Sequence, residues 1–311
     1  MREYKKALVT GGAGFIGSHI AAQLLDRGIE TIVLDNFYMG KKEYIPRGAR
    51  IIDADILDAN TLYEALKGVD VVFHNAARVS IRNSIGDFYD DAYVNIMGTA
   101  NVIRAVIKCQ VKKLIYASSM AVYGNPQSLP IAEDFSLEPD SPYGISKLAG
   151  EKYCLKMAKF NNFEAIALRY FNTYGLRQTL TPYVGVITIF INRLLEGEPP
   201  TIFGDGRQVR DFVSVDDVAR ANILAMEKGR GGQVFNIGTG EGRSVNDIAR
   251  IVINYTSQAI IPEYGPAQPG EPGSSIADIA KARDYLSFSP RYKLEDKIEE
   301  IIEWNKECRK K

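Results

Sequence analysis

The chain has 311 residues, of which 46% are hydrophobic and 24% charged, a composition typical of a globular protein with one large domain or two domains sharing a seam. Its 38 basic and 38 acidic residues cancel, so the overall charge does not indicate a nucleic-acid partner. Three well-separated cysteines and two histidines give no metal-ligand spacing, and we expect no metal site. No run approaches the roughly 18 to 20 apolar residues of a membrane span, and no charged-then-apolar leader is recognisable. We therefore expect a cytoplasmic protein without a membrane partner.

Short apolar runs alternate with amphipathic stretches along the first 170 residues. Candidate helices cover residues 15–28, 60–68, about 88–109 and a segment after Pro142. The runs ALVT, TIVL and DVVF are continuously apolar, as expected for parallel strands covered on both faces. Candidate strands are residues 5–10, 30–35, 49–56, 69–77, 112–119 and 164–170. This alternation predicts an α/β fold with a Rossmann-type, doubly wound parallel sheet.

The regular alternation of strand and helix patterns becomes weaker after about residue 170. Helical patterns recur near 184–197, 216–228, 244–257 and 294–307, whereas 262–275 contains many turn formers and is expected to be a loop. We predict a smaller C-terminal α/β substrate lobe. The expected division is a dinucleotide-binding domain over residues 1–170, with returns to the sheet from about 212–240, and a substrate lobe over 171–311.

A glycine-rich segment, TGGAGFIGSH, lies between the first strand and the first helix. Gly11, Gly14 and Gly17 lack a Cβ, so backbone amides and the helix N-terminus can approach a pyrophosphate. Asp35 ends the second strand, close to the spacing of about 20 residues expected for the acid that binds the ribose hydroxyls of a dinucleotide. This acid would repel a 2′-phosphate and is followed by Asn36, not arginine. The pattern therefore favours NAD over NADP, with Lys41 and Lys42 in a solvated loop.

Further cofactor contacts are predicted at the ends of the next two strands. Asp55 and Ile56 end the third strand, where an adenine ring would emerge. Ala76 and Ala77 close the fourth strand and are small enough for close contact between a cofactor and the backbone. His74 lies within the strand itself, and we expect a structural role for it.

A tyrosine four residues before a lysine is a candidate catalytic pair, because side chains at i and i+4 meet on a helix. The pattern occurs three times, as Tyr38/Lys42, Tyr63/Lys67 and Tyr143/Lys147. Ligands of such folds bind at the carboxyl ends of the strands. The first pair belongs to the adenosine end, and the second leads into the amino end of a strand. Only the third begins a helix soon after a strand whose carboxyl end carries Ser118 and Ser119.

A tyrosine general base must lose its proton near neutral pH, although a free phenol has a pKa of about 10. One nearby cation lowers such a pKa by about 1 to 3 units. We expect Lys147 and a positively charged nicotinamide ring to act together on Tyr143, while Ser119 orients the substrate hydroxyl.

The chain resembles the extended short-chain dehydrogenase/reductases and, within them, the UDP-glucose 4-epimerases. The resemblance spans nearly the whole chain and rests on TGGAGFIG, SS-x-x-VYG, Y-x-x-x-K, RYFNTYG, IFGDG, VRDFVSVDDVA and ADIAKA. It implies that Ser119, Tyr143 and Lys147 are catalytic, that the first two also touch the substrate, and that Lys147 also touches the cofactor. The NAD contacts that it implies are Phe15, Ile16, Asp35, Asn36, Asp55, Ile56, Asn95 and Phe171.

For the substrate, the resemblance implies a UDP-sugar whose diphosphate is held by Asn172 and Arg210, with Phe203 near the uracil. The implied reaction is 4-epimerisation through a transient 4-keto sugar, in a homodimer formed by helices 88–109 and 143–160. Dehydratases and decarboxylases of this kind usually carry an acid just after the catalytic serine, where this chain has Met120 and Ala121.

Two departures affect the substrate. Gln268 replaces an arginine that usually touches the nucleotide diphosphate, which puts the identity of the nucleotide in doubt. Ser275 stands where glucose-restricted members carry a bulky aromatic residue, so the chain is expected to accept UDP-GlcNAc and UDP-GalNAc as well as UDP-glucose and UDP-galactose. The alternatives are a UDP-glucuronate 4-epimerase, a nucleotide-sugar dehydratase or reductase, and a non-catalytic NAD-binding sensor.

Overall fold

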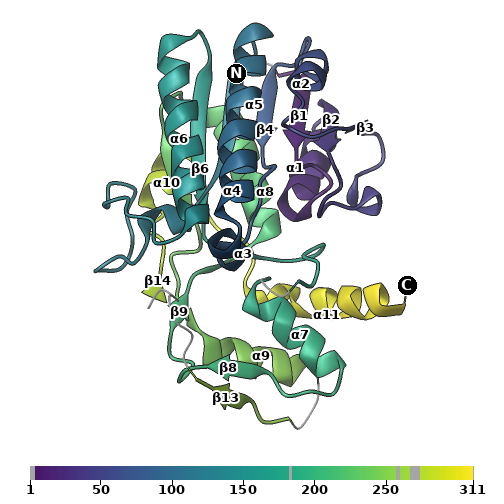
Figure 1. The fold of residues 1–311 in the computed structure, drawn as a ribbon. Helices are drawn as coiled ribbons and strands as arrows, with labels where there is room; N and C mark the ends of the chain where they lie inside the picture. Colours follow the sequence, from purple (N-terminus) through teal and green to yellow (C-terminus); the bar gives the residue numbers. More distant parts are fainter. Residues whose placement is uncertain (1–3, 182–183, 257–259, 267–273, 311) are drawn as a thin grey trace.

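A seven-stranded parallel sheet forms the larger part of the molecule (Figure 1). The computed structural model describes residues 4–181, 184–256, 260–266 and 274–310. The strand order is β11-β6-β5-β4-β1-β2-β3, and every neighbouring pair is parallel. The strands are β1 (Lys6–Thr10), β2 (Glu30–Asp35), β3 (Arg50–Asp53), β4 (Val71–His74), β5 (Lys113–Ser119), β6 (Glu164–Tyr170) and β11 (Val234–Ile237). The predicted Rossmann-type fold is confirmed, with an edge strand contributed from beyond residue 212.

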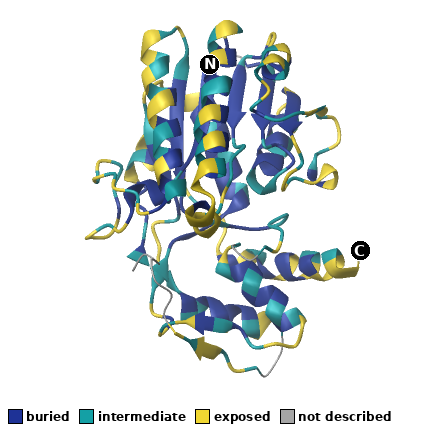
Figure 2. Ribbon diagram, in the orientation of Figure 1, coloured by how far each residue is buried: buried dark blue, intermediate teal, exposed yellow. Residues whose placement is uncertain are grey.

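Helices cover both faces of this sheet because successive side chains of each strand point to opposite sides. Val9 of β1 packs in one apolar core with α1 (Phe15–Leu25), α8 (Val215–Lys228) and α10 (Ala280–Leu286). Its neighbour Leu8 packs in a second core with α2 (Ala59–Ala65), α5 (Thr99–Lys108) and α6 (Pro142–Phe160). The buried faces of these helices are dark in Figure 2. Each continuously apolar strand therefore contributes side chains to both cores, one on each face of the sheet.

The helical stretch expected over 88–109 is interrupted by a wider turn. It consists of α4 (Phe88–Ala92), a π-helical segment η2 (Tyr93–Gly98) and α5. Such π turns are rare and frequently occur at functional sites. Asn95 lies within it, and a short helix α3 (Ile81–Gly86), which the sequence pattern did not predict, precedes it.

The smaller lobe packs around a third core. Its helices are α7 (Val186–Leu195), α9 (Val245–Thr256) and α11 (Leu294–Lys310), close to the predicted positions. The described part of 262–275 differs from the predicted loop, because β13 (Glu263–Gly265) pairs with β8 (Thr201–Phe203) and β14 (Ser274–Ser275) pairs with β9 (Val209–Arg210). These strands are only two or three residues long and pair with distant segments, so they have no hydrophobic periodicity from which they could be predicted. The remaining short elements are β7 (Asn172–Tyr174), β10 (Phe212–Ser214), β12 (Arg243–Ser244), η1 (Lys42–Tyr44) and η3 (Met120–Tyr123).

His74 lies in a buried chain of hydrogen bonds that links β1, β4 and α5. Thr99 Oγ1 donates to the Asn95 carbonyl at 2.6 Å and therefore accepts from His74 Nε2 at 2.9 Å. With the proton on Nε2, Nδ1 of the neutral ring accepts from the Thr10 hydroxyl at 2.7 Å, and Thr10 Oγ1 itself accepts the Ala76 amide at 3.2 Å. The imidazole is neutral in this arrangement, and burial lowers the pKa of His74 to about 3. The predicted structural role fits this geometry.

The buried neutral His74 is expected to make folding pH-dependent. Because its folded pKa lies below the ordinary 6.5, its contribution is complete above pH 6.5 and is lost as the pH falls towards 3. The free energy of unfolding should drop by about 2 kcal/mol between pH 7 and pH 5 from this group alone. Urea unfolding of wild type and His74→Gln at both pH values isolates the effect. An equal pH dependence in the two proteins would contradict it.

Candidate active site at the carboxyl edge of the sheet

The glycine turn between β1 and α1 is shaped to receive an anionic group. Gly11 has a positive φ of 65°, and a Cβ there would lie 2.8 Å from the Ala76 amide nitrogen. A Cβ on Gly17 would collide with the Gly11 carbonyl oxygen. Helix α1 begins at Phe15, its N-cap Gly14 makes no side-chain cap, and its first turn has no acidic residue. The first amides of α1 are therefore available to a phosphate.

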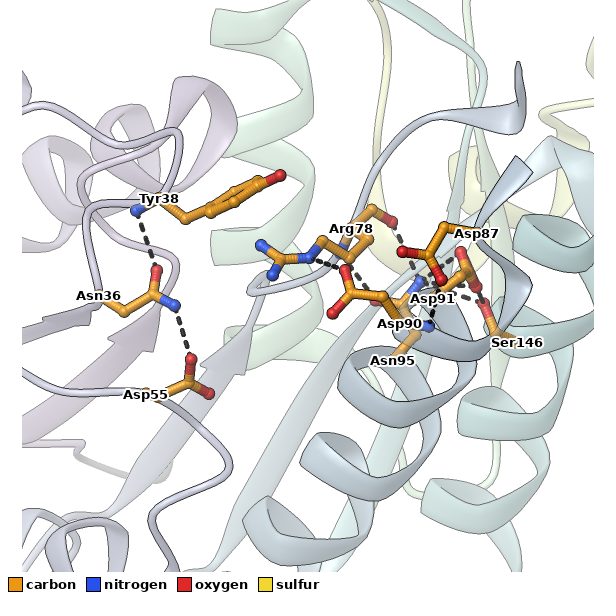
Figure 3. A network of polar contacts seen from close by, with 9 residues as sticks. All are labelled: Asn36, Tyr38, Asp55, Arg78, Asp87, Asp90, Asp91, Asn95 and Ser146. Carbon is orange, nitrogen blue, oxygen red and sulfur yellow. Dashed lines mark hydrogen bonds and ion pairs between the residues drawn. The ribbon is translucent and has the colours of Figure 1, made fainter. Parts of the chain in front are cut away.

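Asp35 and Asn36 lie at the end of β2, beside this turn. The buried Asp35 carboxylate accepts the Ala13 amide at 2.9 Å and the Phe37 amide at 2.8 Å, and burial raises its pKa. Asn36 Nδ2 donates to Asp55 Oδ2 at 2.6 Å (Figure 3). Two residues predicted for the adenosine end, 19 positions apart, thus meet directly.

The segment after β4 lies at the same edge of the sheet. Ala76 and Ala77 are partly buried here. The preceding Asn75, which no sequence motif singled out, has both polar side-chain atoms buried without a hydrogen-bond partner among the described residues. Buried amides are normally paired, so Asn75 has hydrogen-bonding capacity left for a polar ligand or a water molecule at this edge. Ile56 is buried and packs against Gly98 of the π-helical segment.

Tyr143 and Ser119 meet at the same edge. Helix α6 begins at Pro142 after the N-cap Ser141, which accepts the Gly144 amide at 3.1 Å. Ser84 Oγ accepts the Tyr143 amide at 3.1 Å, which fixes the start of the helix. No sequence motif indicates this contact between residues 59 positions apart. Ser119 ends β5, and its side chain is hydrogen-bonded to the Tyr143 phenol. Ser118 points elsewhere and donates to the buried Glu151 at 2.7 Å.

Lys147 lies one helical turn after Tyr143 and is almost entirely buried. Its ammonium nitrogen lies 4.7 Å from the centre of the Tyr116 ring, and burial lowers the pKa of Lys147 to about 8. Burial raises the pKa of Tyr143 to about 12, against the hydrogen bond from Ser119 and together with the Asp91 charge. The near-neutral pKa expected from the sequence includes the positive charge of an oxidised nicotinamide, whereas this value reflects protein groups alone. Lys147 is not among the groups that shift the Tyr143 pKa, so the protein alone keeps the phenol protonated at pH 7.

Asn95 was expected to touch NAD, but its amide is occupied by protein groups. Its Oδ1 accepts the Arg78 amide at 2.7 Å, and its Nδ2 donates to the Arg78 carbonyl at 3.0 Å. The same Nδ2 lies 3.1 Å from Ser146 Oγ and 3.1 Å from Asp91 Oδ1 (Figure 3). In this structure Asn95 joins the loop after β4 to helix α6.

Three of the predicted substrate residues are gathered around Asp211. The Asp211 carbonyl accepts the Asn172 amide at 3.0 Å, and the Asp211 amide donates to the Ser275 carbonyl at 2.8 Å. Arg210 and Ser275 are direct partners in the β9–β14 register. Ser275 is buried, and its Oγ has no hydrogen-bond partner among the described residues.

The predicted substrate residue Phe203 ends β8 in a different, two-stranded sheet and is 37% exposed. Phe171, predicted as an NAD contact, is buried directly after β6. Gln268 lies outside the described residues.

A Rossmann-type sheet with a glycine turn, an acidic strand end and a serine–tyrosine pair followed by a buried lysine at one edge defines a dinucleotide-dependent enzyme. The chain belongs to the NAD dependent epimerase/dehydratase family, whose sequence model matches residues 7–238. The predicted family resemblance is thereby confirmed. In the described part of the chain, no helix combines the length and apolar character needed to cross a membrane.

Three relatives are similar to this chain over nearly its whole length. A UDP-glucose 4-epimerase from Thermotoga maritima, solved with UDP-glucose, is 40% identical with a TM-score of 0.94 and covers 97% of this chain and 99% of its own. A UDP-N-acetylglucosamine 4-epimerase from Methanobrevibacter ruminantium, solved with UDP-N-acetylmuramic acid, is 35% identical with a TM-score of 0.94 and covers 99% and 100%. A UDP-N-acetyl-alpha-D-glucosaminuronate decarboxylase from Bacillus cytotoxicus is 34% identical over 97% of this chain and 98% of its own length. The relatives thus include different reactions on UDP-sugars.

Proposed function

We propose that the chain catalyses the NAD-dependent 4-epimerisation of a UDP-hexose through a transient 4-keto sugar. The observation that carries this proposal is the meeting of Ser119, Tyr143 and buried Lys147 at the edge that also holds the glycine turn. Its support from relatives is the near full-length similarity to a UDP-glucose 4-epimerase. The substrates are UDP-glucose and UDP-galactose, extended to their N-acetylated counterparts.

The residues at this edge fit NAD. The uncapped amides of α1 suit its pyrophosphate, while Asp35 keeps lone pairs for the ribose hydroxyls beyond its two backbone contacts. The other proposed contacts are Gly11, Gly14, Phe15, Ile16, Gly17, Asn36, Asp55, Ile56, Ala76, Ala77, Lys147 and Phe171.

Each catalytic side chain then has a distinct task. NAD, when bound, would supply the hydride acceptor for sugar C4 and the donor for return of that hydride to the opposite face of the ring. Tyr143 Oη takes the proton of the 4-hydroxyl and gives it back, and Ser119 holds that hydroxyl in line. Because protein groups leave the Tyr143 pKa at about 12, the phenolate must be stabilised by the positive charges assembled with the ligands. Lys147 contributes a buried ammonium group one turn away.

The sugar nucleotide is assigned to the smaller lobe. Arg210 precedes Asp211 in the chain and Asn172 is hydrogen-bonded to the Asp211 carbonyl, so the two proposed donors to the diphosphate are brought into one group. Ser275 stands where glucose-restricted relatives carry a bulky aromatic residue, and this small side chain supports a substrate range that includes UDP-GlcNAc. Residues 1–170 with the return from about 212–240 hold the cofactor in this proposal, and 171–311 hold the nucleotide sugar, with Phe203 near the uracil.

A homodimer in the cytoplasm is part of the same proposal. Exposed apolar side chains follow one face of the α4–η2 segment, where Tyr89, Tyr93 and Met97 are 73%, 48% and 52% exposed. Tyr153 and Phe160 extend this apolar surface on α6. Large contiguous apolar patches typically mark contact sites, and a second copy of the chain fits a surface made of two long helices.

The assay that tests the proposal uses purified chain without added NAD. UDP-glucose, UDP-GlcNAc and UDP-glucuronate are supplied separately, and the products are followed by NMR. We expect the 4-epimers of the first two. A product that has lost water or a carboxyl group would favour the related dehydratase or decarboxylase chemistry, which the absence of an acid at Met120 and Ala121 disfavours. Bound NAD without any turnover would indicate a sensor.

A further inference from the structure

Tyr38 and Arg78 form a stacked pair across the cofactor edge. The guanidinium carbon of Arg78 lies 3.6 Å from the centre of the Tyr38 ring, close enough for a face-to-face cation–π contact. The two side chains come from different loops and reach towards one another in Figure 3. Tyr38 is 64% exposed, so its position is not explained by burial in an apolar core.

The pair spans the glycine turn. Tyr38 follows β2 by three residues, and Arg78 follows β4 by four, while β1 lies between these two strands. The glycine turn begins directly after β1. A bridge from the loop after β2 to the loop after β4 therefore crosses the carboxyl end of β1, where a bound pyrophosphate would lie.

Both ends of the bridge are anchored. The Tyr38 amide donates to Asn36 Oδ1 at 3.0 Å, and Asn36 in turn contacts Asp55. Arg78 is held by both of its backbone polar groups to Asn95, and its Nε donates to Asp90 Oδ2 at 2.6 Å. These contacts orient the ring and the guanidinium before any ligand contributes. An anchored aromatic–arginine pair of this kind can act as a closure, unlike a freely rotating surface pair.

We propose that Tyr38 and Arg78 form a clasp over the dinucleotide cleft that slows both uptake and release of NAD. The inference rests on the proposed use of NAD and adds a function for two residues that do no chemistry. The stack must part for the dinucleotide to pass in either direction. Its guanidinium also places positive charge above the pyrophosphate.

The test measures NAD exchange directly. NAD-loaded chain is chased with an excess of a fluorescent etheno analogue of NAD to obtain the release rate, and stopped-flow binding to stripped chain gives the uptake rate. Tyr38→Ala should raise both rates by roughly two- to fivefold, the factor that corresponds to one exposed cation–π contact, while the ratio of the two rates changes less. Tyr38→Phe keeps the ring and should exchange NAD at the wild-type rate.

Two further variants identify the pair as one unit. Arg78→Ala should resemble Tyr38→Ala, and the double variant should exchange NAD no faster than either single variant. Lys108→Ala is the matched control, because Lys108 lies 3.7 Å from the Tyr63 ring centre in a similar pair on α5 and α2. Its NAD exchange rates should equal those of wild type.

The outcomes separate the clasp from the proposed reaction. Unchanged exchange in Tyr38→Ala, or Tyr38→Phe exchanging as fast as Tyr38→Ala, overturns the clasp even if wild type epimerises UDP-glucose. Faster exchange in Lys108→Ala would also overturn it, since that result indicates general loosening. Faster exchange confined to the clasp variants supports the clasp even if no sugar is converted. Failure of wild type to bind NAD would overturn both proposals.

Discussion

Replacing Tyr143 with phenylalanine is expected to lower the epimerisation rate by about 10³-fold, within the range typical of a lost general acid–base group. The phenol is the group that takes the proton from the 4-hydroxyl, and Ser119 alone has no comparable basicity. Phenylalanine keeps the ring, so NAD retention and folding should be preserved. The measurement is the single-turnover rate, with the fraction of co-purified NAD as the check on integrity.

The control for this variant is Tyr63→Phe. Tyr63 also precedes a lysine by four residues, but it lies on α2 beneath Lys67 and Lys108, whose ammonium groups are 5.0 Å and 3.7 Å from its ring centre. Its loss should leave the rate unchanged. Equal losses of rate in the two variants would show that the effect is not specific to Tyr143. A near-normal rate in Tyr143→Phe would show that Tyr143 is not the general base.

Replacing Arg169 with methionine is expected to lower the free energy of unfolding by about 3 to 5 kcal/mol. Its guanidinium pairs with Glu151 at 2.7 Å and 3.0 Å, with 3% and 1% of the two side chains exposed. The variant would leave a carboxylate buried without its cation. Denaturant unfolding measures the loss, which matters for the site because Glu151 lies one turn after Lys147 and accepts from Ser118.

A second replacement separates the pair from the packing around it. Adding Glu151→Met to Arg169→Met removes the uncompensated charge and should recover at least about 2 kcal/mol. Lys67→Met is the surface control, since Lys67 and Glu64 are 53% and 63% exposed and such pairs contribute about 1 kcal/mol or less. A small loss in Arg169→Met, comparable to that control, would contradict the account.

Much of this architecture could be predicted from local sequence. Continuous apolar runs identify parallel strands, and the glycine turn followed by Asp35 predicts the phosphate and ribose positions because only particular residue types fit there. Tyr143 is preferred among three tyrosine–lysine pairs because it begins a helix near the carboxyl end of a strand, away from the adenosine end. In the structure its phenol is hydrogen-bonded to Ser119.

Other features depend on contacts between distant segments. The pairing of β14 with β9 is set by tertiary structure, and the stack of Arg78 on Tyr38 joins loops 40 residues apart. The raised pKa of Tyr143 also depends on tertiary structure, because burial of the phenol by segments distant in the sequence raises it to about 12. Charges act through the whole surrounding structure, which spacing in a sequence does not reveal.

The most direct test of the proposed reaction follows a single atom. UDP-glucose carrying deuterium at sugar C4 is incubated with the purified chain in ordinary water, without added NAD, and the product is examined by NMR. We predict UDP-galactose that retains the deuterium at C4, because the same hydride leaves and returns while only the hydroxyl proton passes through Tyr143. Loss of the deuterium to water, or a product lacking the 4-epimer, would contradict the proposal.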